Sequence, residues 1–434
     1  MKTKSTIPEL YNLFRSSKSV CTDTRKISEG CLFFCLKGGN FDGNKFALEA
    51  VSQGALAAIV DDEEVAENDK CYLVDDVLTA LQDVAAYHRD QLKIPVIGIT
   101  GSNGKTTTKE LLREVLATTF NTSYTLGNFN NHIGVPLTLL AIPEDAEMVI
   151  VEMGANHIGE IAALCQICKP THGLITNIGK AHLEGFGSLE GVARGKSELY
   201  AYLLENHGVV FVNGSDEHLV RMAQRIPNSI NYAQSGSKAE LDLVDASSYL
   251  VINWGDKQMK TQLVGAYNFA NVAAAVALGE YFKVKTENII SAIEGYSPDN
   301  NRSELINKNG INVILDAYNA NPTSMEAAIN NFKQLNVTNK IAVLGDMYEL
   351  GSSSNEEHFR IAQLAGESGF EHVYLCGALF SEVIVDKEKV SQFRSREDLM
   401  VDLKKLDLQG KHLLIKGSRG MGLEKLVESI GEVM

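Results

Sequence analysis

The stretch Ile94-Pro-Val-Ile-Gly-Ile-Thr-Gly-Ser-Asn-Gly-Lys-Thr-Thr-Thr108 decides the fold of the middle of this chain. Its first seven residues are mostly apolar and predict a buried strand, and apolar residues recur at helical spacing from Lys105 to Phe120. A glycine-rich turn joins the two. The stretch therefore predicts a strand, a loop and a helix, an arrangement whose backbone N–H groups and helix dipole can hold phosphate oxygens.

The predicted phosphate loop departs from the usual spacing but keeps its chemistry. In the GxxxxGK[ST] pattern a glycine stands five places before Gly104, where this chain has Ile99, and the glycine lies at Gly101 instead. Lys105 would reach the β- and γ-phosphates, and Thr106 would offer its hydroxyl to Mg²⁺. An ordinary glycine-rich turn would not explain Gly-Lys-Thr-Thr-Thr at a helix start. We expect ATP to contact Gly101, Ser102, Asn103, Gly104, Lys105, Thr106 and Thr107.

Composition and charge narrow the protein class. The 434 residues are 44% apolar and 22% charged, as in a globular protein, and the net charge of −15 argues against nonspecific binding of nucleic acid or anionic lipid. The first residues lack the apolar core of a signal peptide, and no run of 18 apolar residues occurs. We therefore expect a cytoplasmic protein that binds no nucleic acid and does not insert into membranes.

The seven cysteines are an odd number without secretory features, so reduced thiols are expected. Cys165-Gln-Ile-Cys168 has the CxxC spacing of a pair that could bind metal or act in redox chemistry. No second such pair or nearby histidine pair completes a zinc site. We interpret both cysteines as small residues packed on a helix.

The whole chain predicts an α/β protein with three domains. Residues 1–92 mix short apolar runs with Gly-rich turns and form a small N-terminal α/β domain. Residues 93–298 continue from the phosphate loop with strands at 148–153 and 173–178, which indicates a mostly parallel sheet with helices on both faces. Turn formers at 295–301 mark a boundary, and residues 299–434 alternate strands with helices as a Rossmann-like domain.

Three polar residues follow these strands and are candidates for the phosphate site. Glu152 lies at the carboxyl end of the second strand, following Met148-Val-Ile-Val151, and His182 comes after the third strand. Ligands collect at these ends in open α/β sheets. Lys196 lies where another helix begins. Taken singly, Glu152 could be a solvated strand end, Lys196 a surface lysine, and His182 a structural histidine, since magnesium prefers oxygen ligands.

Taken together, the central motifs resemble those of the Mur ligases and their folylpolyglutamate synthetase relatives. The motifs occur in that family's order and approximate spacing: the phosphate loop, Glu152-Met-Gly-Ala-Asn156, Thr176-Asn-Ile-Gly179 with Ala181-His-Leu-Glu184, and Lys196-Ser-Glu198.

The resemblance implies roles for these residues. It implies that CO₂ carbamylates Lys196 and that the modified lysine binds Mg²⁺ with Thr106, Glu152 and His182. The implied catalytic residues are Lys105, Glu152, His182 and Lys196. In Gly265-Ala-Tyr-Asn-Phe-Ala-Asn271 it implies that Asn268 and Asn271 contact adenine, while Tyr267 stands where the family usually has histidine.

The flanking domains extend the resemblance, and the C-terminal one indicates the branch. The UDP-sugar-binding domain of the Mur ligases that act late in the pathway is similar to Thr22-Asp-Thr-Arg25 and Gly30-Cys-Leu-Phe-Phe-Cys-Leu-Lys-Gly38. The C-terminal domain of the branch that adds D-alanyl-D-alanine is similar to Asp316-Ala-Tyr-Asn-Ala-Asn-Pro-Thr-Ser-Met325, Val343-Leu-Gly-Asp-Met-Tyr-Glu-Leu-Gly351 and Lys416-Gly-Ser-Arg419. The resemblance implies that Arg302 approaches the ATP phosphates and Asp316 the ribose. Implied substrate contacts are Asp23, Arg25, Asn44, Asn130, Tyr318, Asn319 and Asn321.

The implied activity is ATP-dependent ligation of D-alanyl-D-alanine to a UDP-N-acetylmuramoyl-tripeptide through an acyl phosphate, by a monomer. Two alternatives stay open. Another ligase of the family would add a different amino acid to a UDP-muramoyl or folate acceptor. A nucleotide-dependent switch would turn over ATP or GTP slowly without any acceptor, because a phosphate loop alone does not distinguish signalling from synthesis.

Overall fold

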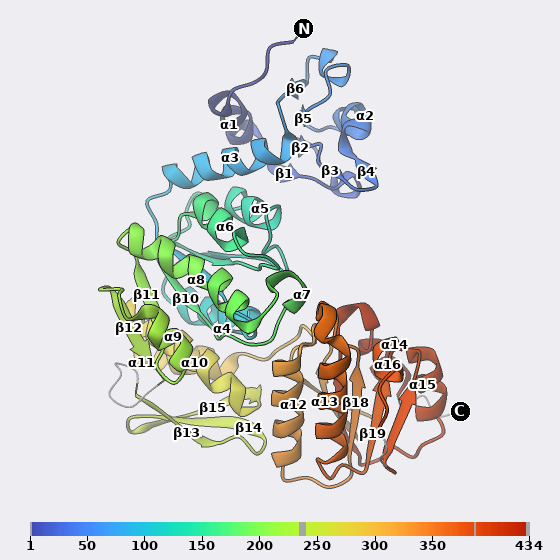
Figure 1. Ribbon diagram of the computed structural model, residues 1–434. Coiled ribbons are helices and arrows are strands. Elements are labelled where there is room, and N and C mark those ends of the chain that lie inside the picture. Colours follow the sequence, from blue (N-terminus) through green and yellow to red (C-terminus); the bar gives the residue numbers. More distant parts are fainter. Residues whose placement is uncertain (1, 234–239, 386–387, 431–434) are drawn as a thin grey trace.

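The computed structural model describes residues 2–233, 240–385 and 388–430. Three α/β units follow one another along the chain, with the N-terminal unit at one end of the molecule (Figure 1). The fold class predicted from the sequence is confirmed. Among the described residues, no helix is long and apolar enough to cross a membrane.

The N-terminal unit is built on a parallel sheet with the order β1-β2-β5-β6. Its central strands are continuous apolar runs because both faces are covered: Phe34 packs toward α1 and α3, and Phe33 packs toward α2. The elements of this unit are α1 (Ile7–Ser16), β1 (Ser19–Cys21), η1 (Thr24–Lys26), β2 (Cys31–Phe34), β3 (Lys37–Gly38), β4 (Phe41–Asp42), η2 (Gly43–Phe46), α2 (Ala47–Ser52), β5 (Ala57–Val60), η3 (Val65–Glu67), β6 (Cys71–Leu73) and α3 (Val77–Gln91).

Helix α3 joins the first unit to the second. Asp76 caps its N-terminus by accepting a hydrogen bond from Thr79 N at 2.7 Å. Near its other end, the buried Arg89 donates to the carbonyls of Cys168 and Lys169, both at 3.0 Å, and so satisfies the C-terminus of α6. The helix therefore fixes the small unit against the central one.

The central unit contains a six-stranded parallel sheet with the order β12-β11-β10-β7-β9-β8. Side chains alternate between two cores: Val96 and Val149 face α5, α6 and α8, whereas Ile97 and Ile150 face α4, α10 and α11. Its elements are β7 (Val96–Thr100), α4 (Lys105–Ala117), β8 (Thr122–Tyr124), α5 (Gly134–Leu140), β9 (Met148–Glu152), α6 (Glu160–Cys168), β10 (His172–Ile175), α7 (Leu183–Phe186), α8 (Leu189–Glu205), β11 (Val209–Asn213), α9 (Glu217–Ala223), β12 (Ser229–Tyr232), η4 (Ala266–Asn268), α10 (Phe269–Tyr281) and α11 (Thr286–Gly295).

A separate antiparallel sheet lies beside this unit and was not predicted from the sequence. It consists of β13 (Leu241–Asp245), β14 (Tyr249–Trp254) and β15 (Lys257–Val264). Alternate residues of β15, such as Met259 and Leu263, are buried in the core that α10 and α11 also share. The sheet therefore packs through β15 against α11 in the central unit.

The C-terminal unit is a six-stranded sheet with the order β16-β17-β21-β18-β19-β20, in which only β16 runs antiparallel to its neighbour. Helices α12 and α13 cover one face in Figure 1. The elements are β16 (Glu304–Lys308), β17 (Ile311–Asp316), α12 (Pro322–Gln334), β18 (Lys340–Gly345), η5 (Gly351–Ser353), α13 (Ser354–Gly366), β19 (His372–Cys376), α14 (Ala378–Ser381), β20 (Val390–Phe393), α15 (Arg396–Leu403), β21 (His412–Lys416), η6 (Arg419–Met421) and α16 (Glu424–Ser429).

All seven cysteines are free and buried. The Cys165 and Cys168 sulfurs lie 4.0 and 3.7 Å from the sulfur of Met153, inside the core between α6 and the central sheet. Burial raises the pKa of the Cys168 thiol to about 12. The packing interpretation of this pair is confirmed.

Candidate active site

The phosphate loop between β7 and α4 has two positions that only glycine fits. Gly101 has a φ of +142°, and a Cβ there would lie 2.0 Å from Thr176 Oγ1. Gly104 has a φ of +81°, and its Cβ would lie 2.5 Å from Asn271 Oδ1. These close approaches shape the turn that presents the first N–H groups of α4, and they explain why the glycines occur at these two places.

The segment 176–179, which follows β10, supports the loop from one side. Thr176 Oγ1 donates to Asn103 O at 2.5 Å, and Asn177 Oδ1 accepts from Asn103 N at 3.0 Å. Ser102 Oγ donates to Gly179 O at 3.0 Å. Side chains of a neighbouring strand end therefore hold the loop in shape before any ligand arrives.

Lys105, at the start of α4, is folded back onto its own loop. Its Nζ donates to Gly101 O at 2.7 Å and to Ser102 O at 3.2 Å. Burial lowers the pKa of Lys105 to about 8, while Glu152 opposes the shift and Arg302 adds to it. The ammonium can exchange these carbonyl partners for phosphate oxygens, whose negative charge favours its protonated form. Thr107 follows in the first turn, half-buried.

Glu152, the last residue of β9, is fully enclosed by polar side chains. Its Oε1 accepts hydrogen bonds from Asn130 Nδ2 at 2.9 Å and from Thr106 Oγ1 at 3.2 Å. Its Oε2 lies 3.6 Å from Nζ of Lys109, and both side chains are at most 2% exposed. Lys109 Nζ also lies 5.9 Å from the centre of the Tyr124 ring. Thr106, Asn130 and Glu152 are thus brought together, with Lys109 as their buried countercharge.

Lys196 is buried in α8, with 1% of its surface exposed. Its Nζ donates to Ala155 O at 3.2 Å and lies 5.2 Å from the centre of the Phe186 ring. Burial, reinforced by the Lys105 cation, lowers the pKa of Lys196 to about 7. A large fraction of this side chain is therefore a neutral amine near neutral pH.

His182 faces the C-terminal unit. Its backbone φ is +53°, and its Nδ1 lies 2.6 Å from Glu349 Oε2 in the segment after β18. This contact lowers the pKa of Glu349. In the described part of the chain, no three His, Cys, Asp or Glu side chains gather at one metal-sized point. The structure thus brings Glu152 and Thr106 together, while His182 is engaged across the domain boundary.

Asn268 and Asn271 form a buried chain behind the phosphate loop. Asn268 Nδ2 donates to Val264 O at 2.9 Å, Asn271 Nδ2 donates to Asn268 Oδ1 at 2.8 Å, and Thr108 Oγ1 donates to Asn271 Oδ1 at 3.1 Å. The chain connects α10 with the loop helix α4. Tyr267 is 36% exposed, and its hydroxyl lies 2.7 Å from Ser303 Oγ.

The C-terminal unit contributes a cluster of charges at the carboxyl ends of β17 and β21. The guanidinium of Arg302 lies 3.7 Å from the centre of the Tyr318 ring, and that of Arg419 lies 5.1 Å from the same centre. Asp316 Oδ2 is paired with the buried Lys416 Nζ at 2.6 Å. Lys416 also donates to the carbonyl of the exposed Asn319 at 3.3 Å.

The cluster lies directly against the phosphate loop. Asn321 Nδ2 donates to Asn103 Oδ1 at 2.7 Å, and Lys180 N donates to Thr323 Oγ1 at 3.0 Å. Lys180 Nζ pairs with Glu357 at 2.5 Å. The site therefore lies where the central and C-terminal units meet, and this region between the two units is named the cleft.

The N-terminal candidates lie in their own unit. Arg25 pairs with Asp23 through two hydrogen bonds of 2.9 and 2.8 Å, and this lowers the pKa of Asp23 to about 2. Asn44 is buried and donates its amide to Asp42 at 2.9 Å and to Asp61 at 2.7 Å. Arg25 is exposed and accessible to a ligand, whereas Asn44 holds together the turn after β4.

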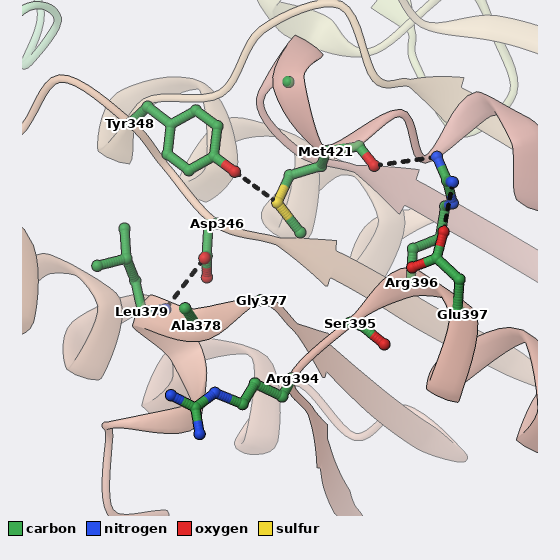
Figure 2. A pocket seen from close by; sticks show the side chains of 11 residues that line it. Asp346, Tyr348, Gly377, Ala378, Leu379, Arg394, Ser395, Arg396, Glu397 and Met421 are labelled. Carbon is green, nitrogen blue, oxygen red and sulfur yellow. Dashed lines mark hydrogen bonds and ion pairs between the residues drawn. The ribbon is translucent and has the colours of Figure 1, made fainter.

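A pocket of about 690 Å³ opens at the carboxyl ends of β18 to β20, farther along the same sheet edge (Figure 2). Asp346 lines it but accepts hydrogen bonds from Leu379 N and Phe380 N, and so caps α14. Arg394 also lines the pocket, and Figure 2 shows it well apart from Met421. It forms no ion pair in the described part of the chain. The sequence did not single out this pocket.

Sequence reasoning also missed three residues of the cleft. Lys109 lies four residues after Lys105 on α4 and is buried, although the sequence did not single it out. Lys416 and Arg419 belong to the motif Lys416-Gly-Ser-Arg419, but the resemblance implied no role for either side chain. Buried lysines paired with carboxylates at strand ends would have been the useful signal, and only the three-dimensional arrangement reveals it.

Comparisons with known proteins agree over the whole chain. Residues 17–91, 99–279 and 301–419 match the models described as Mur ligase family, catalytic domain; Mur ligase middle domain; and Mur ligase, glutamate ligase domain. The UDP-N-acetylmuramoyl-tripeptide–D-alanyl-D-alanine ligase of Bacillus subtilis is 37% identical, covering 95% of this chain and 93% of its own length.

Solved structures are similar as well. A crystal structure of MurF from Acinetobacter baumannii superposes with a TM-score of 0.87 at 32% identity and covers 99% of each chain. MurF ligase from Thermotoga maritima, in complex with ADP, superposes with a TM-score of 0.85 at 26% identity, covering 97% of this chain and 98% of that one.

Proposed function

This chain belongs to the Mur ligase family, and we propose that it is the ATP-dependent ligase that joins D-alanyl-D-alanine to the terminal carboxylate of UDP-N-acetylmuramoyl-tripeptide. The products are the UDP-muramoyl-pentapeptide, ADP and phosphate, and the reaction belongs to peptidoglycan precursor synthesis. We assign residues 1–92 to the UDP-muramoyl substrate, 93–298 to ATP and 299–434 to the ligase domain that receives the dipeptide. We further propose that the enzyme acts as a cytoplasmic monomer.

One contact supports this function above the switch alternative: the 2.7 Å hydrogen bond between Asn321 and Asn103. It places the carboxyl edge of a second α/β sheet against the phosphate loop, so the γ-phosphate would lie between two ligand-binding sheet edges. A ligase that joins two acceptors needs such a cleft, whereas a switch needs only the first sheet.

The first chemical step activates the tripeptide carboxylate. A carboxylate is a poor electrophile, so one of its oxygens attacks the γ-phosphorus of ATP, the bond to the β-phosphate oxygen breaks, and an acyl phosphate and ADP form. Lys105 would neutralise charge on the transferring phosphoryl group, and Arg302 would approach it from the C-terminal unit. Catalysis is then mainly positioning and charge stabilisation.

The residues around Glu152 fit a Mg²⁺ ion. Glu152 Oε2 is buried without a hydrogen-bond partner in the described structure, and the hydroxyl of Thr106 supplies a neutral oxygen beside the carboxylate. Thr106 and Glu152 would hold the ion, with phosphate oxygens from the nucleotide. Bound Mg²⁺ would supply a positive charge that stabilises the phosphoryl oxygens. His182 would join this set only after leaving Glu349.

Lys196 fits carbamylation because its side chain is buried and its lowered pKa, about 7, leaves a substantial neutral fraction of the amine near neutral pH. Only a neutral amine attacks CO₂, and the carbamate would turn a cation into a carboxylate-like ligand near Lys105. The variant Lys196→Ala should lose ligase activity and regain part of it when a short-chain carboxylic acid is added. With ¹³CO₂, the wild type should show a carbamate carbon signal that the variant lacks. Absence of both the signal and any rescue would count against the modification.

The second step forms the peptide bond. The amine of D-alanyl-D-alanine attacks the acyl carbon, a tetrahedral intermediate collapses, and phosphate leaves while the amine loses a proton. Water would destroy the acyl phosphate, so the cleft has to exclude it. Contacts such as Lys180 with Glu357 already join the two units and would help to close the cleft.

The test is phosphate release from ATP with each acceptor alone and with both together, combined with mass spectrometry of the product. We expect release only when UDP-muramoyl-tripeptide and D-alanyl-D-alanine are both present, with the pentapeptide mass appearing. Release that needs a different amino acid or acceptor would move the chain to another branch of the family. Turnover that is indifferent to every acceptor would support the switch.

A further inference from the structure

Arg419 is a cation at the edge of the cleft that has no acidic partner among the described residues. It is exposed at the start of η6, directly after β21. Its Nη1 donates to the hydroxyl of Tyr318 at 3.3 Å, and it forms no ion pair with any described residue. The neighbouring Lys416 is already paired with Asp316 at 2.6 Å. The charge of Arg419 is therefore available to a ligand.

The ring of Tyr318 links Arg419 to the phosphate site. Arg302 lies 3.7 Å and Arg419 5.1 Å from the same ring centre, so their guanidinium carbons are at most 8.8 Å apart, the sum of the two distances. Arg302 is the cation close enough to Lys105 to depress its pKa. Tyr318 thus connects one cation that belongs to the phosphate site with a second one in the cleft.

A dipeptide with a free carboxylate matches this spacing. Its amine has to reach the acyl carbon at the phosphate site, and two extended residues span about 7 Å. The terminal carboxylate then lies about 7 Å from the reacting centre. This reach is comparable with the upper limit of 8.8 Å between the guanidinium carbons of Arg302 and Arg419. A guanidinium binds a carboxylate through two parallel hydrogen bonds, which an amide or ester in its place would not reproduce.

We infer that Arg419 binds the terminal carboxylate of the incoming dipeptide and thereby selects acceptors that carry one. The inference rests on the proposed function, because it requires a dipeptide in this cleft. The residue that recognises the carboxylate then follows β21, the strand beside β17. The two strands pair in register from Asn312 with His412 to Asp316 with Lys416, so they end side by side.

The test compares D-alanyl-D-alanine with D-alanyl-D-alaninamide, in which the carboxylate is a neutral amide. We expect the wild type to prefer the free acid by about 10- to 100-fold in kcat/KM, the range expected for a hydrogen bond between charged groups. Arg419→Ala should lose about the same factor with the acid and almost nothing with the amide. The KM values for ATP and UDP-muramoyl-tripeptide should not change.

Arg394→Ala is the matched control, because Arg394 is an exposed arginine without an ion pair in the described structure and lies on the same sheet edge (Figure 2). It should behave as the wild type with both acceptors. Arg419→Lys, which keeps the charge but not the planar fork, should retain part of the preference for the acid.

Two results would overturn the inference. In one, Arg419→Ala lowers kcat/KM equally for acid and amide; in the other, it raises KM for ATP or the UDP-linked substrate instead. A wild type that ligates neither acceptor would refute the proposed function itself, and this outcome is distinct because it is seen before any variant is compared.

Discussion

Replacing Lys109 with methionine tests the buried charge pair beneath the proposed metal site. Lys109 and Glu152 are 3.6 Å apart, and both are at most 2% exposed. The variant keeps an apolar chain in the same space but leaves the carboxylate without its ammonium. We expect the folded state to become less stable and to gain affinity for divalent cations.

The expected loss of folding stability depends on the burial of the charge pair more than on the distance between the charged atoms. At 3.6 Å and an effective dielectric constant near 20, the attraction is about 4 to 5 kcal/mol. Removing one member of a buried pair costs about 3 to 5 kcal/mol. Lys257 and Glu287 are closer, at 2.9 Å, but are 40% and 75% exposed, so Lys257→Met should cost less than about 1 kcal/mol.

Urea unfolding of the nucleotide-free protein measures both effects. Lys109→Met should lower the free energy of unfolding by about 3 kcal/mol or more, and millimolar MgCl₂ should restore part of it because the ion binds only the folded state. NaCl at equal ionic strength should not. A loss no larger than that of Lys257→Met, or no response to Mg²⁺, would refute the reasoning.

Three further predictions concern the loop, the pH response and the closing of the cleft. Gly101→Ala would place a Cβ 2.0 Å from Thr176 Oγ1 at a φ of +142°, so it should weaken ATP binding by at least about tenfold in a calorimetric titration while the fold persists. Burial lowers the pKa of His88 to about 4, so the unfolded chain takes up its proton first as the pH falls below about 6.5. Stability should therefore fall from pH 7 to pH 5, and by about 2 kcal/mol less in His88→Gln; an equal fall in both proteins would contradict this. ATP analogue plus UDP-muramoyl-tripeptide should reduce the radius of gyration in small-angle scattering, and no compaction would count against domain closure.

Several parallel strands could be predicted because they contain continuous apolar runs. The runs 148–151 and 373–376 are buried on both faces, so their prediction needed no knowledge of their neighbours. The antiparallel sheet was missed although β15 carries a period of two, with Met259 and Leu263 buried and Lys260 exposed. Each of its strands has only one covered face, and that weaker alternation is easily read as a loop.

Site residues that belong to a local sequence motif could be predicted. Site residues whose role depends on packing between distant segments could not. Gly101 and Gly104 stand in the loop and have the positive φ angles that the turn requires and that glycine adopts without strain. By contrast, the burial of Lys109 depends on β9 and Tyr124, and the pairing of His182 with Glu349 depends on how two domains meet. Such contacts between distant segments leave no periodic signal in the sequence.

The most direct test of the central claim follows one oxygen atom through the reaction. UDP-muramoyl-tripeptide labelled with ¹⁸O in its terminal carboxylate is incubated with ATP and D-alanyl-D-alanine, and the released phosphate is analysed by mass spectrometry. Attack of the carboxylate on the γ-phosphate predicts one ¹⁸O atom in the phosphate for each pentapeptide formed. Pentapeptide with unlabelled phosphate would contradict an acyl phosphate, and labelled water in place of labelled substrate should leave the phosphate unlabelled.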